Sequence, residues 1–441
     1  MRGSIHGIVG RGVAMLLLAT VSGPLALAAE PTATEAPALD GTVDRYVARA
    51  LDGTPAVRAA FQRWEAAVHR VARARALPEP IVQLGVFVQS VETRVGPQQA
   101  RISVQQAFPW PTALTAGGAA AGEEAHAAEA MLEATAVAVA ERVELAYWSL
   151  WEVRATRALH GQHLEILTGL SQTTRSRLEI GGATLSDLQQ IDLSRARLED
   201  GIRSMDEAER SAEANLRAAI GERDGASLPT TTEPRLAQPA EADLTDAVLR
   251  HPTLASLGHV ADAADARAKS KAANRLPGFT VGADWIITGP ALMPNTPDDG
   301  KDAVAAGLGL RVPLWQGTYS HDVAAERGMA AAHRAEQQGR GDHALAALAG
   351  ALSDVRDSAR RVAVHSGTLL PQADAAYASV LGNYTVGQSA VAQTLLAQRD
   401  LLDLSVELAR ASADHQRAWA RLDQLAGREV ARAPIQPEET P

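Results

Sequence analysis

Two histidines on one predicted helix have the spacing of metal ligands. His160 and His163 lie three residues apart, and residues with that spacing share one face of an α-helix. A structural metal site needs further ligands, and the sequence places no third one beside this pair. Four histidines of the second half are scattered and likewise form no ligand set: His321, His333, His343 and His365. We therefore assign these side chains to surface or packing roles and predict no metal site and no cofactor.

The sequence lacks the short motifs that mark common catalytic sites. It has no Gly-rich phosphate loop, no His-Glu-x-x-His helix and no Gly-x-Ser-x-Gly elbow. No carboxylate pair falls in a segment that would form a compact pocket. We predict that the protein is not an enzyme.

The longest predicted element is a helical hairpin over residues 112–220 that reverses at Gly181-Gly182. Alanine dominates its outgoing arm, and no proline occurs between Thr112 and Ile180, which favours helix strongly. The return arm carries apolar residues at steps of three and four, which indicates one buried stripe. Since the outgoing arm would be on the order of 100 Å long, we expect a coiled-coil-like assembly of several helices.

Residues 1–28 have the three parts of a secretory signal. Arg2 and Arg11 supply the positive region, an apolar run follows from Val13, and small residues end at Ala28. We predict export, the alternative being an N-terminal helix of the mature protein. The chain has no cysteine, so neither a disulfide, a thiolate site nor a lipid anchor is expected. Its net charge of -10 argues against a nucleic-acid partner.

The order of landmarks along the chain occurs twice. In each half a helix ends at a Leu-Pro pair, two strand-like runs follow, and a second proline landmark opens a long helix, a glycine turn and a closing helix. The halves are offset by about 200 to 206 residues, which indicates a duplication. The predicted segments are a first repeat at 29–221, a linker at 222–243, a second repeat at 244–427 with its hairpin at 317–426, and a flexible tail at 428–441.

The strand-like runs lie at 81–90, 101–108, 279–288 and 303–312. Each has about the length of a tilted transmembrane strand, and the runs alternate between apolar and polar residues. The segments between the members of each pair, 92–100 and 289–302, are polar or rich in proline and glycine, as hairpin loops are. Beyond the signal no apolar run is long enough for a membrane helix. Four strands cannot close a barrel, so we expect several copies to assemble.

These features resemble the outer-membrane efflux proteins of the TolC type over essentially the whole mature chain. The resemblance rests on the repeated strand-pair order, on the passage Gln-Gln-Ala-Phe-Pro-Trp-Pro from Gln105, and on two turn motifs, Gly-Gly-Ala-Thr-Leu-Ser-Asp-Leu from Gly181 and Tyr-Thr-Val-Gly from Tyr384. It implies a mainly α fold with a transmembrane β part. In that fold a homotrimer shares a 12-stranded outer-membrane β-barrel, four strands per protomer, continued by a long α-helical periplasmic barrel.

The same resemblance implies a function in efflux. Such a trimer is a passive exit duct that docks a periplasmic adaptor protein and an inner-membrane pump and exports small solutes. The Phe-Pro-Trp-Pro passage and the segment Ala146 to Trp151 are most similar to members that serve heavy-metal pumps, so metal cations are favoured over drugs as cargo. Two alternatives stay open: a periplasmic adaptor, with one hairpin and small β-domains, or a coiled-coil structural protein of the cell envelope, without strand pairs.

The resemblance also places site residues at the two hairpin turns, Gly181 and Gly387. Asp187 matches an acidic residue that lines the tunnel's narrow end; the alternative is a first-turn aspartate stabilised by the helix dipole. Gln393 and Leu396 stand where an aspartate pair commonly follows the second glycine, so we expect a less acidic constriction.

Arginines and aromatic residues complete the set of candidates. Five arginines near the turns would either join helices as a gate or form weak surface pairs: Arg175, Arg177, Arg195, Arg197 and Arg399. Trp110 and Trp315 follow matched strands, which suits either a belt at the membrane interface or plain packing. Tyr147, Trp148 and Trp151 lie in the middle of the long helix, and we predict that they pack against the linker.

Overall fold

The computed structural model describes residues 40–433, except 224, 226, 241 and 242. The predicted signal 1–28 lies outside these residues, as does the end of the predicted tail 428–441. The chain forms two compact units. The first comprises the described residues up to Ala59, Glu133–Pro252 and the described residues from Gly341; the second comprises Ala60–Leu132 and Thr253–Arg340. Each unit draws on both sequence halves, so the division into two repeats stays a prediction.

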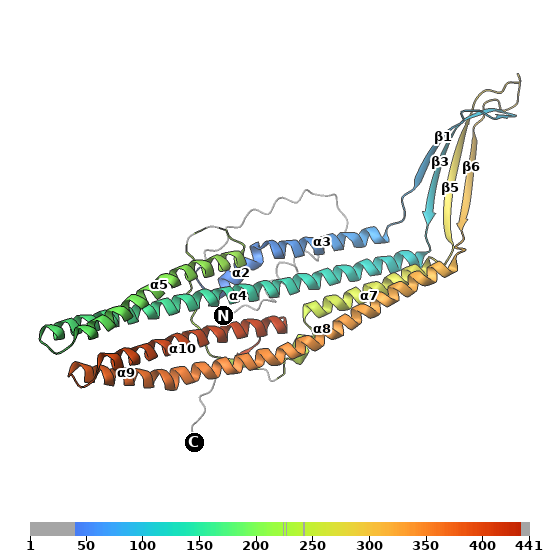
Figure 1. The fold of residues 1–441 in the computed structure, drawn as a ribbon. Coiled ribbons are helices and arrows are strands. Elements are labelled where there is room, and N and C mark those ends of the chain that lie inside the picture. The colour runs from blue at the N-terminus through green and yellow to red at the C-terminus, as the bar shows by residue number, and fades with distance from the viewer. Residues whose placement is uncertain (1–39, 224, 226, 241–242, 434–441) are drawn as a thin grey trace. The chain divides into compact units, whose positions relative to one another are not determined.

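The second unit contains an antiparallel sheet with four main strands in the order β1-β3-β5-β6 (Figure 1). Its strands are β1 (Ile81–Val86), β3 (Gly96–Phe108), β5 (Gly278–Thr288) and β6 (Ala303–Arg311). A two-residue strand, β2 (Glu92–Thr93), pairs with the start of β3. The central pair, β3 with β5, joins strands from the two sequence halves.

The first predicted hairpin loop, 92–100, is wrong in part. Strand β3 begins at Gly96 rather than at residue 101, and β1 ends at Val86 rather than at residue 90. Gln98 and Ala100 pair with Thr288 and Ile287 of β5, and these distant partners extend the strand beyond its alternating residues. Gly96 is required where β3 begins, because its φ is +129° and an added Cβ would meet a backbone oxygen of Gly289 at 1.8 Å.

Helices of the second unit pack closely through small residues. This unit contains α7 (Pro252–Ala273) and parts of α3 (Pro55–Arg75), α4 (Pro111–Glu179) and α8 (Gln316–Val364). Six alanines of α7 are buried, and its Ser256 hydroxyl donates to the Ala127 carbonyl of α4 at 2.9 Å. Alanine and serine allow this approach because their side chains are short. Within the described chain, no helix is both long enough and apolar enough to cross a bilayer.

The first unit is built from two helical hairpins. In one, α4 turns at Gly181 into α5 (Leu185–Ile220); in the other, α9 (Leu370–Thr385) turns at Gly387 into α10 (Val391–Ala426). Both glycines have a positive φ, +74° and +81°, a conformation that side chains with a Cβ rarely adopt. Short elements that the sequence analysis did not predict complete the unit: α2 (Val43–Gly53), α6 (Thr245–Leu249), and the strand pair β4 (Gln238–Pro239) with β7 (Arg432–Ala433).

The long helix predicted to open the second hairpin is interrupted. A π-helical turn, η1 (His365–Leu369), separates α8 from α9, and the Leu370 N–H donates to the His365 carbonyl five residues earlier. Pro371 explains the interruption, because it has no N–H to give to an α-helical bond and its ring crowds the preceding turn.

Within the first unit, aromatic side chains of α4 pack against the linker, as predicted for Tyr147. This side chain is fully buried, its hydroxyl donates to the Gly41 carbonyl at 2.9 Å, and it accepts the Thr232 N–H at 2.8 Å. Trp148 and Leu228 share the same core cluster. The linker is therefore held by buried contacts with α4.

A buried histidine on α10 holds a second part of the linker. The Nε2 atom of His415 accepts two hydrogen bonds at 3.2 Å, from the Ala237 N–H and from the Trp419 indole. Its Nδ1 lies 3.0 Å from the Ser358 hydroxyl. Two donors on Nε2 require the neutral imidazole, and burial lowers the pKa of His415 to about 4.

We expect this histidine to make the fold sensitive to acid. The unfolded chain binds the proton at about pH 6.5 whereas the folded chain does not until about pH 4, so stability falls as the pH drops between these values, by up to about 3 kcal/mol. Thermal unfolding of purified protein at pH 7 and pH 4.5 measures the loss. His415→Gln should lose less of its stability over that range; an equal loss in both proteins would contradict the assignment.

Candidate functional site

One face of the sheet is apolar across all four main strands, apart from Gln106 of β3. Because side chains alternate along a strand, the pairing register decides which residues share a face. Leu84 pairs with Ile102, which pairs with Trp285, which pairs with Val304. The same face carries further apolar side chains: Val82, Val86, Ala100, Val104, Phe108, Phe279, Val281, Ala283, Ile287, Ala306, Leu308 and Leu310. Most of the large ones are exposed, although water disfavours such a surface.

The opposite face is polar or small, apart from Ile81 and Ile286. Gln105, Ser103 and Gln83 lie on it with the glycines of β5 and β6. Arg101 of β3 forms an ion pair with Asp284 of β5 at 2.8 Å. The sheet thus has one face suited to lipid and one suited to water, the pattern of a transmembrane β-barrel wall.

Both outer strands have a free edge in the part of the chain that the structure describes. Strand β1 pairs only with β3, and β6 pairs only with β5. Open edges expose unpaired N–H and C=O groups, which a protein either covers or pairs. The edges of this sheet therefore call for a partner strand.

The first hairpin turn places Asp187 in a capping box. Its Oδ2 accepts the Thr184 N–H at 2.9 Å and the Thr184 hydroxyl at 2.8 Å, and its own N–H donates to that hydroxyl at 3.2 Å. These contacts satisfy N–H groups at the start of α5. The first-turn role weighed for Asp187 is confirmed, and a role in lining a tunnel stays a prediction.

The second turn exposes the other two predicted residues. Leu396 and Gln393 both have exposed side chains on the first turns of α10. Three apolar residues beside the turns are exposed as well, namely Ile180, Leu185 and Val386. Both turns of the first unit therefore present apolar side chains to the outside.

Arg177 joins the two hairpins near their turns. Its guanidinium donates to the Tyr384 carbonyl and, at 3.0 Å, to the Gly182 carbonyl, and it lies over the Tyr384 ring at 4.7 Å. The Tyr384 hydroxyl lies 2.6 Å from that of Thr174, where both are buried. The partners of this arginine are thus a carbonyl and an aromatic ring rather than the aspartates that the sequence analysis considered.

The other arginines near the turns behave as surface residues. Arg195 pairs with Asp192 and Glu199 of its own helix, and Arg399 pairs with Asp403 of its own helix. Exposed pairs of this kind contribute a few tenths of a kcal/mol. The surface role is confirmed for these two arginines.

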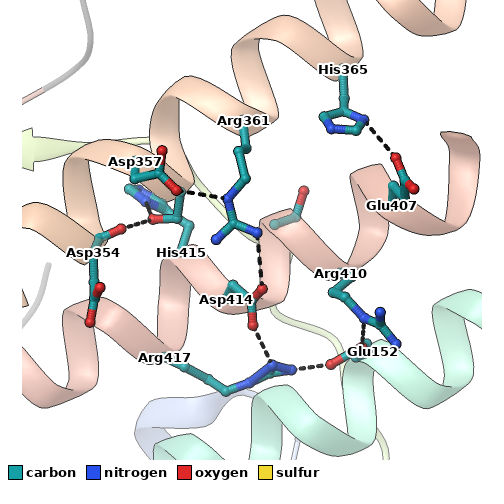
Figure 2. Close-up of polar contacts among 12 residues, drawn as sticks. Glu152, Asp354, Asp357, Arg361, His365, Glu407, Arg410, Asp414, His415 and Arg417 are labelled. Atoms are coloured by element: carbon teal, nitrogen blue, oxygen red, sulfur yellow. Dashed lines mark hydrogen bonds and ion pairs between the residues drawn. The ribbon is translucent and has the colours of Figure 1, made fainter.

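A series of ion pairs joins the two hairpins at a second place along their helices (Figure 2). The sequence analysis did not predict these ion pairs. Glu152 of α4 contacts Arg417 of α10 and lies 3.3 Å from Arg410. Asp414 then bridges Arg417 at 3.0 Å and Arg361 of α8 at 3.5 Å. The spacing of Arg410, Asp414 and Arg417 is the sequence signal that could have indicated these ion pairs, because it places three charges on one face of α10.

The remaining predicted residues occupy two different environments. Trp110 is half-buried, with its ring 6.4 Å from that of Phe279, whereas Trp315 is exposed. His163 is buried and its Nδ1 lies 2.8 Å from the Gln398 amide; burial and the neighbouring His160 lower its pKa. The packing role given to His163 is confirmed, and the belt role of the tryptophans stays a prediction.

Comparison with known proteins identifies relatives. Residues 244–428 match the family described as outer membrane efflux protein. The outer membrane efflux protein BepC of Brucella suis biovar 1 (strain 1330) is 24% identical over 272 residues, which cover 61% of this chain and 59% of BepC. The chain therefore spans about three fifths of that relative.

Solved structures share the fold. VceC of Vibrio cholerae superimposes with a TM-score of 0.71 at 18% identity, covering 88% of this chain and 96% of VceC. CusC superimposes with a TM-score of 0.75 at 13% identity, covering 87% of this chain and 91% of CusC. The open-state channel MtrE of Neisseria gonorrhoeae superimposes with a TM-score of 0.69 at 15% identity, covering 88% of this chain and 89% of MtrE. VceC is an outer membrane protein, CusC forms a transmembrane channel and MtrE is an outer-membrane channel. The predicted fold class, mainly α with a membrane β part, is confirmed.

Proposed function

We propose that this chain is a passive exit duct of a tripartite efflux system, because residues 244–428 match the outer membrane efflux protein family. The protein resides in the outer membrane and extends helices into the periplasm. In the proposal, three copies form the duct, a periplasmic adaptor protein docks on it, and an inner-membrane pump supplies the energy.

The four-stranded sheet is the observation that most strongly supports the exit-duct proposal. Its apolar face would meet lipid, its polar face would line the pore, and its free edges would close only against other copies. In the hydrocarbon region every backbone N–H and C=O must be paired. If β6 of one copy pairs with β1 of the next, three copies close a ring of four strands each, which is a 12-stranded barrel.

The hairpin turns supply the periplasmic end of the proposed duct. Exposed Ile180, Leu185 and Val386 would form the apolar docking surface for the adaptor. Asp187, whose Oδ1 makes no hydrogen bond in the capping box, would add a ring of three carboxylates to the constriction, with Gln393 and Leu396 beside it. Current through reconstituted trimers tests this ring: Asp187→Asn should reduce preference for cations, and an unchanged preference would refute it.

The two tryptophans would mark the membrane boundary. Trp315 is exposed just after β6, and Trp110 follows β3. An indole at such a position places its ring among lipid head groups. Fluorescence quenching by brominated lipids should therefore be strong for Trp315 in vesicles; quenching that is unaffected by Trp315→Phe would exclude it from the belt.

The exit-duct proposal is tested by finding which cell fraction contains the protein and by measuring the mass of the solubilised protein. Protein from the outer-membrane fraction, solubilised in detergent, should have the mass of three chains. A monomer released by osmotic shock would instead support the adaptor alternative, and a fibrous assembly without membrane association would support the structural one.

The cargo is tested by growth. A deletion strain with and without the gene would be grown with zinc, cobalt, cadmium, copper or silver salts, and with detergents and hydrophobic drugs. Tolerance restored only to metals would support metal cations as cargo, whereas tolerance restored to drugs and detergents would overturn that preference.

A further inference from the structure

Two histidines outside the surfaces described above face each other in the second unit. His126 lies on α4 and His259 on α7, and their ring centroids are 5.4 Å apart with the planes tilted by 36°. Each imidazole has a carboxylate neighbour on α4: His259 Nδ1 lies 2.8 Å from Glu123 Oε2, and His126 Nδ1 lies 3.4 Å from Glu129 Oε2. These four side chains, which we term the His126–His259 cluster, are accessible to solvent.

The carboxylates fix the tautomer of both rings. An ionised carboxylate only accepts hydrogen bonds, so each Nδ1 carries the proton and donates it. A neutral imidazole protonated at Nδ1 has its lone pair on Nε2. This is the arrangement in which metal-binding histidines occur, with the second nitrogen held by a carboxylate that orients the ring and raises its basicity.

The separation of the rings fits one shared ion. A zinc–nitrogen bond is about 2.0–2.1 Å, which puts each ring centroid roughly 3 Å from the metal. At a tetrahedral angle, two such centroids lie about 5 Å apart, close to the observed 5.4 Å. The neighbouring carboxylates of Glu123 and Glu129 add negative charge that favours a cation.

We propose that the His126–His259 cluster binds a divalent transition-metal ion of the class that prefers imidazole, such as zinc, nickel or copper. Among the described residues no group of three or more metal-ligating side chains is already assembled, so the ion takes two imidazoles from the protein and completes its shell with water. Such a site binds weakly and exchanges its ion readily. The proposal does not depend on the proposed exit duct or on its cargo.

Metal binding by the purified full-length protein tests the site. Protein prepared without a histidine tag is titrated with Ni²⁺ or Zn²⁺ by calorimetry, as wild type and as His126→Ala, His259→Ala and the double variant. We expect either single variant to lose at least tenfold in affinity, and the double variant to lose little more. Glu123→Gln, which keeps the shape but not the charge, should lose roughly 10- to 100-fold.

His321→Ala is the matched control, because His321 is an exposed histidine of the same unit outside the cluster, and it should bind as the wild type does. Electron paramagnetic resonance of one equivalent of Cu²⁺ should show two coordinating nitrogens in the wild type and one in either single variant. The proposal is overturned if the wild type binds no metal stoichiometrically, or if the double variant binds as tightly as the His321→Ala control. Failure of the duct proposal would show separately, in the extraction test.

Discussion

Replacing Leu308 with arginine should prevent the protein from accumulating in the outer membrane. Leu308 lies in the middle of β6 on the apolar face, where its side chain is 76% exposed. If that face meets lipid, the guanidinium would enter hydrocarbon, at a cost of ~2–4 kcal/mol in each copy near the midplane of a barrel. The proposed trimer would contain the substitution three times, so we expect little protein in the membrane fraction and more in periplasmic degradation products, measured by immunoblot after fractionation.

The neighbouring residue provides a stringent control. Gly307 precedes Leu308 and lies on the polar face, and no atom lies within 4 Å of a Cβ added there. Gly307→Arg therefore introduces the same charge into the same strand, but towards the proposed pore. It should assemble in nearly normal amounts and narrow the channel. Equal loss of both variants would mean that β6 tolerates no arginine, and normal assembly of Leu308→Arg would refute a lipid-facing role for the apolar face.

The strands show how far sequence reasoning extends to this fold. Strands β5 and β6 were predicted to within about one residue, because a sheet with one apolar face and one polar face imposes a period of two on the sequence. The start of β3 was missed because Gln98 and Ala100 are ordered by β5, almost 190 residues away. The sequence of residues 92–100 has no alternation of apolar and polar residues that would predict pairing with β5.

The candidate site was predictable where a residue's role is local. Gly181 and Gly387 are needed by the backbone at the turns, and Asp187 follows Thr184 at the spacing of a capping box, so the sequence itself contains both signals. The contact of Arg177 with Tyr384 was not predictable. It depends on which face of α4 meets α9, and the register of helices separated by about 200 residues is set by packing, not by a sequence motif.

That contact leads to the second large effect, on the gating of the proposed duct. Replacing Arg177 with alanine removes hydrogen bonds from a charged donor, worth ~1.5–3 kcal/mol, and a cation–π contact worth ~0.5–2 kcal/mol. Both join α4 to the turn of the second hairpin. If the turns must separate for solute to pass, the closed arrangement loses ~2–5 kcal/mol. At 1.4 kcal/mol per factor of ten, the ratio of open to closed channels should rise about 30-fold or more.

Single-channel conductance in planar bilayers measures that ratio, and sensitivity of cells to a large antibiotic reports it in vivo. Arg175→Ala is the matched control, since Arg175 is exposed on the same helix and lies two residues away. It removes the same charge and should change neither readout. Tyr384→Phe should have a smaller effect, because it keeps the carbonyl and the ring and loses only the hydroxyl contact with Thr174. If Arg177→Ala and Arg175→Ala conduct alike, the Arg177–Tyr384 contact does not hold the hairpins closed, and the series of ion pairs around Glu152 becomes the better candidate for that role.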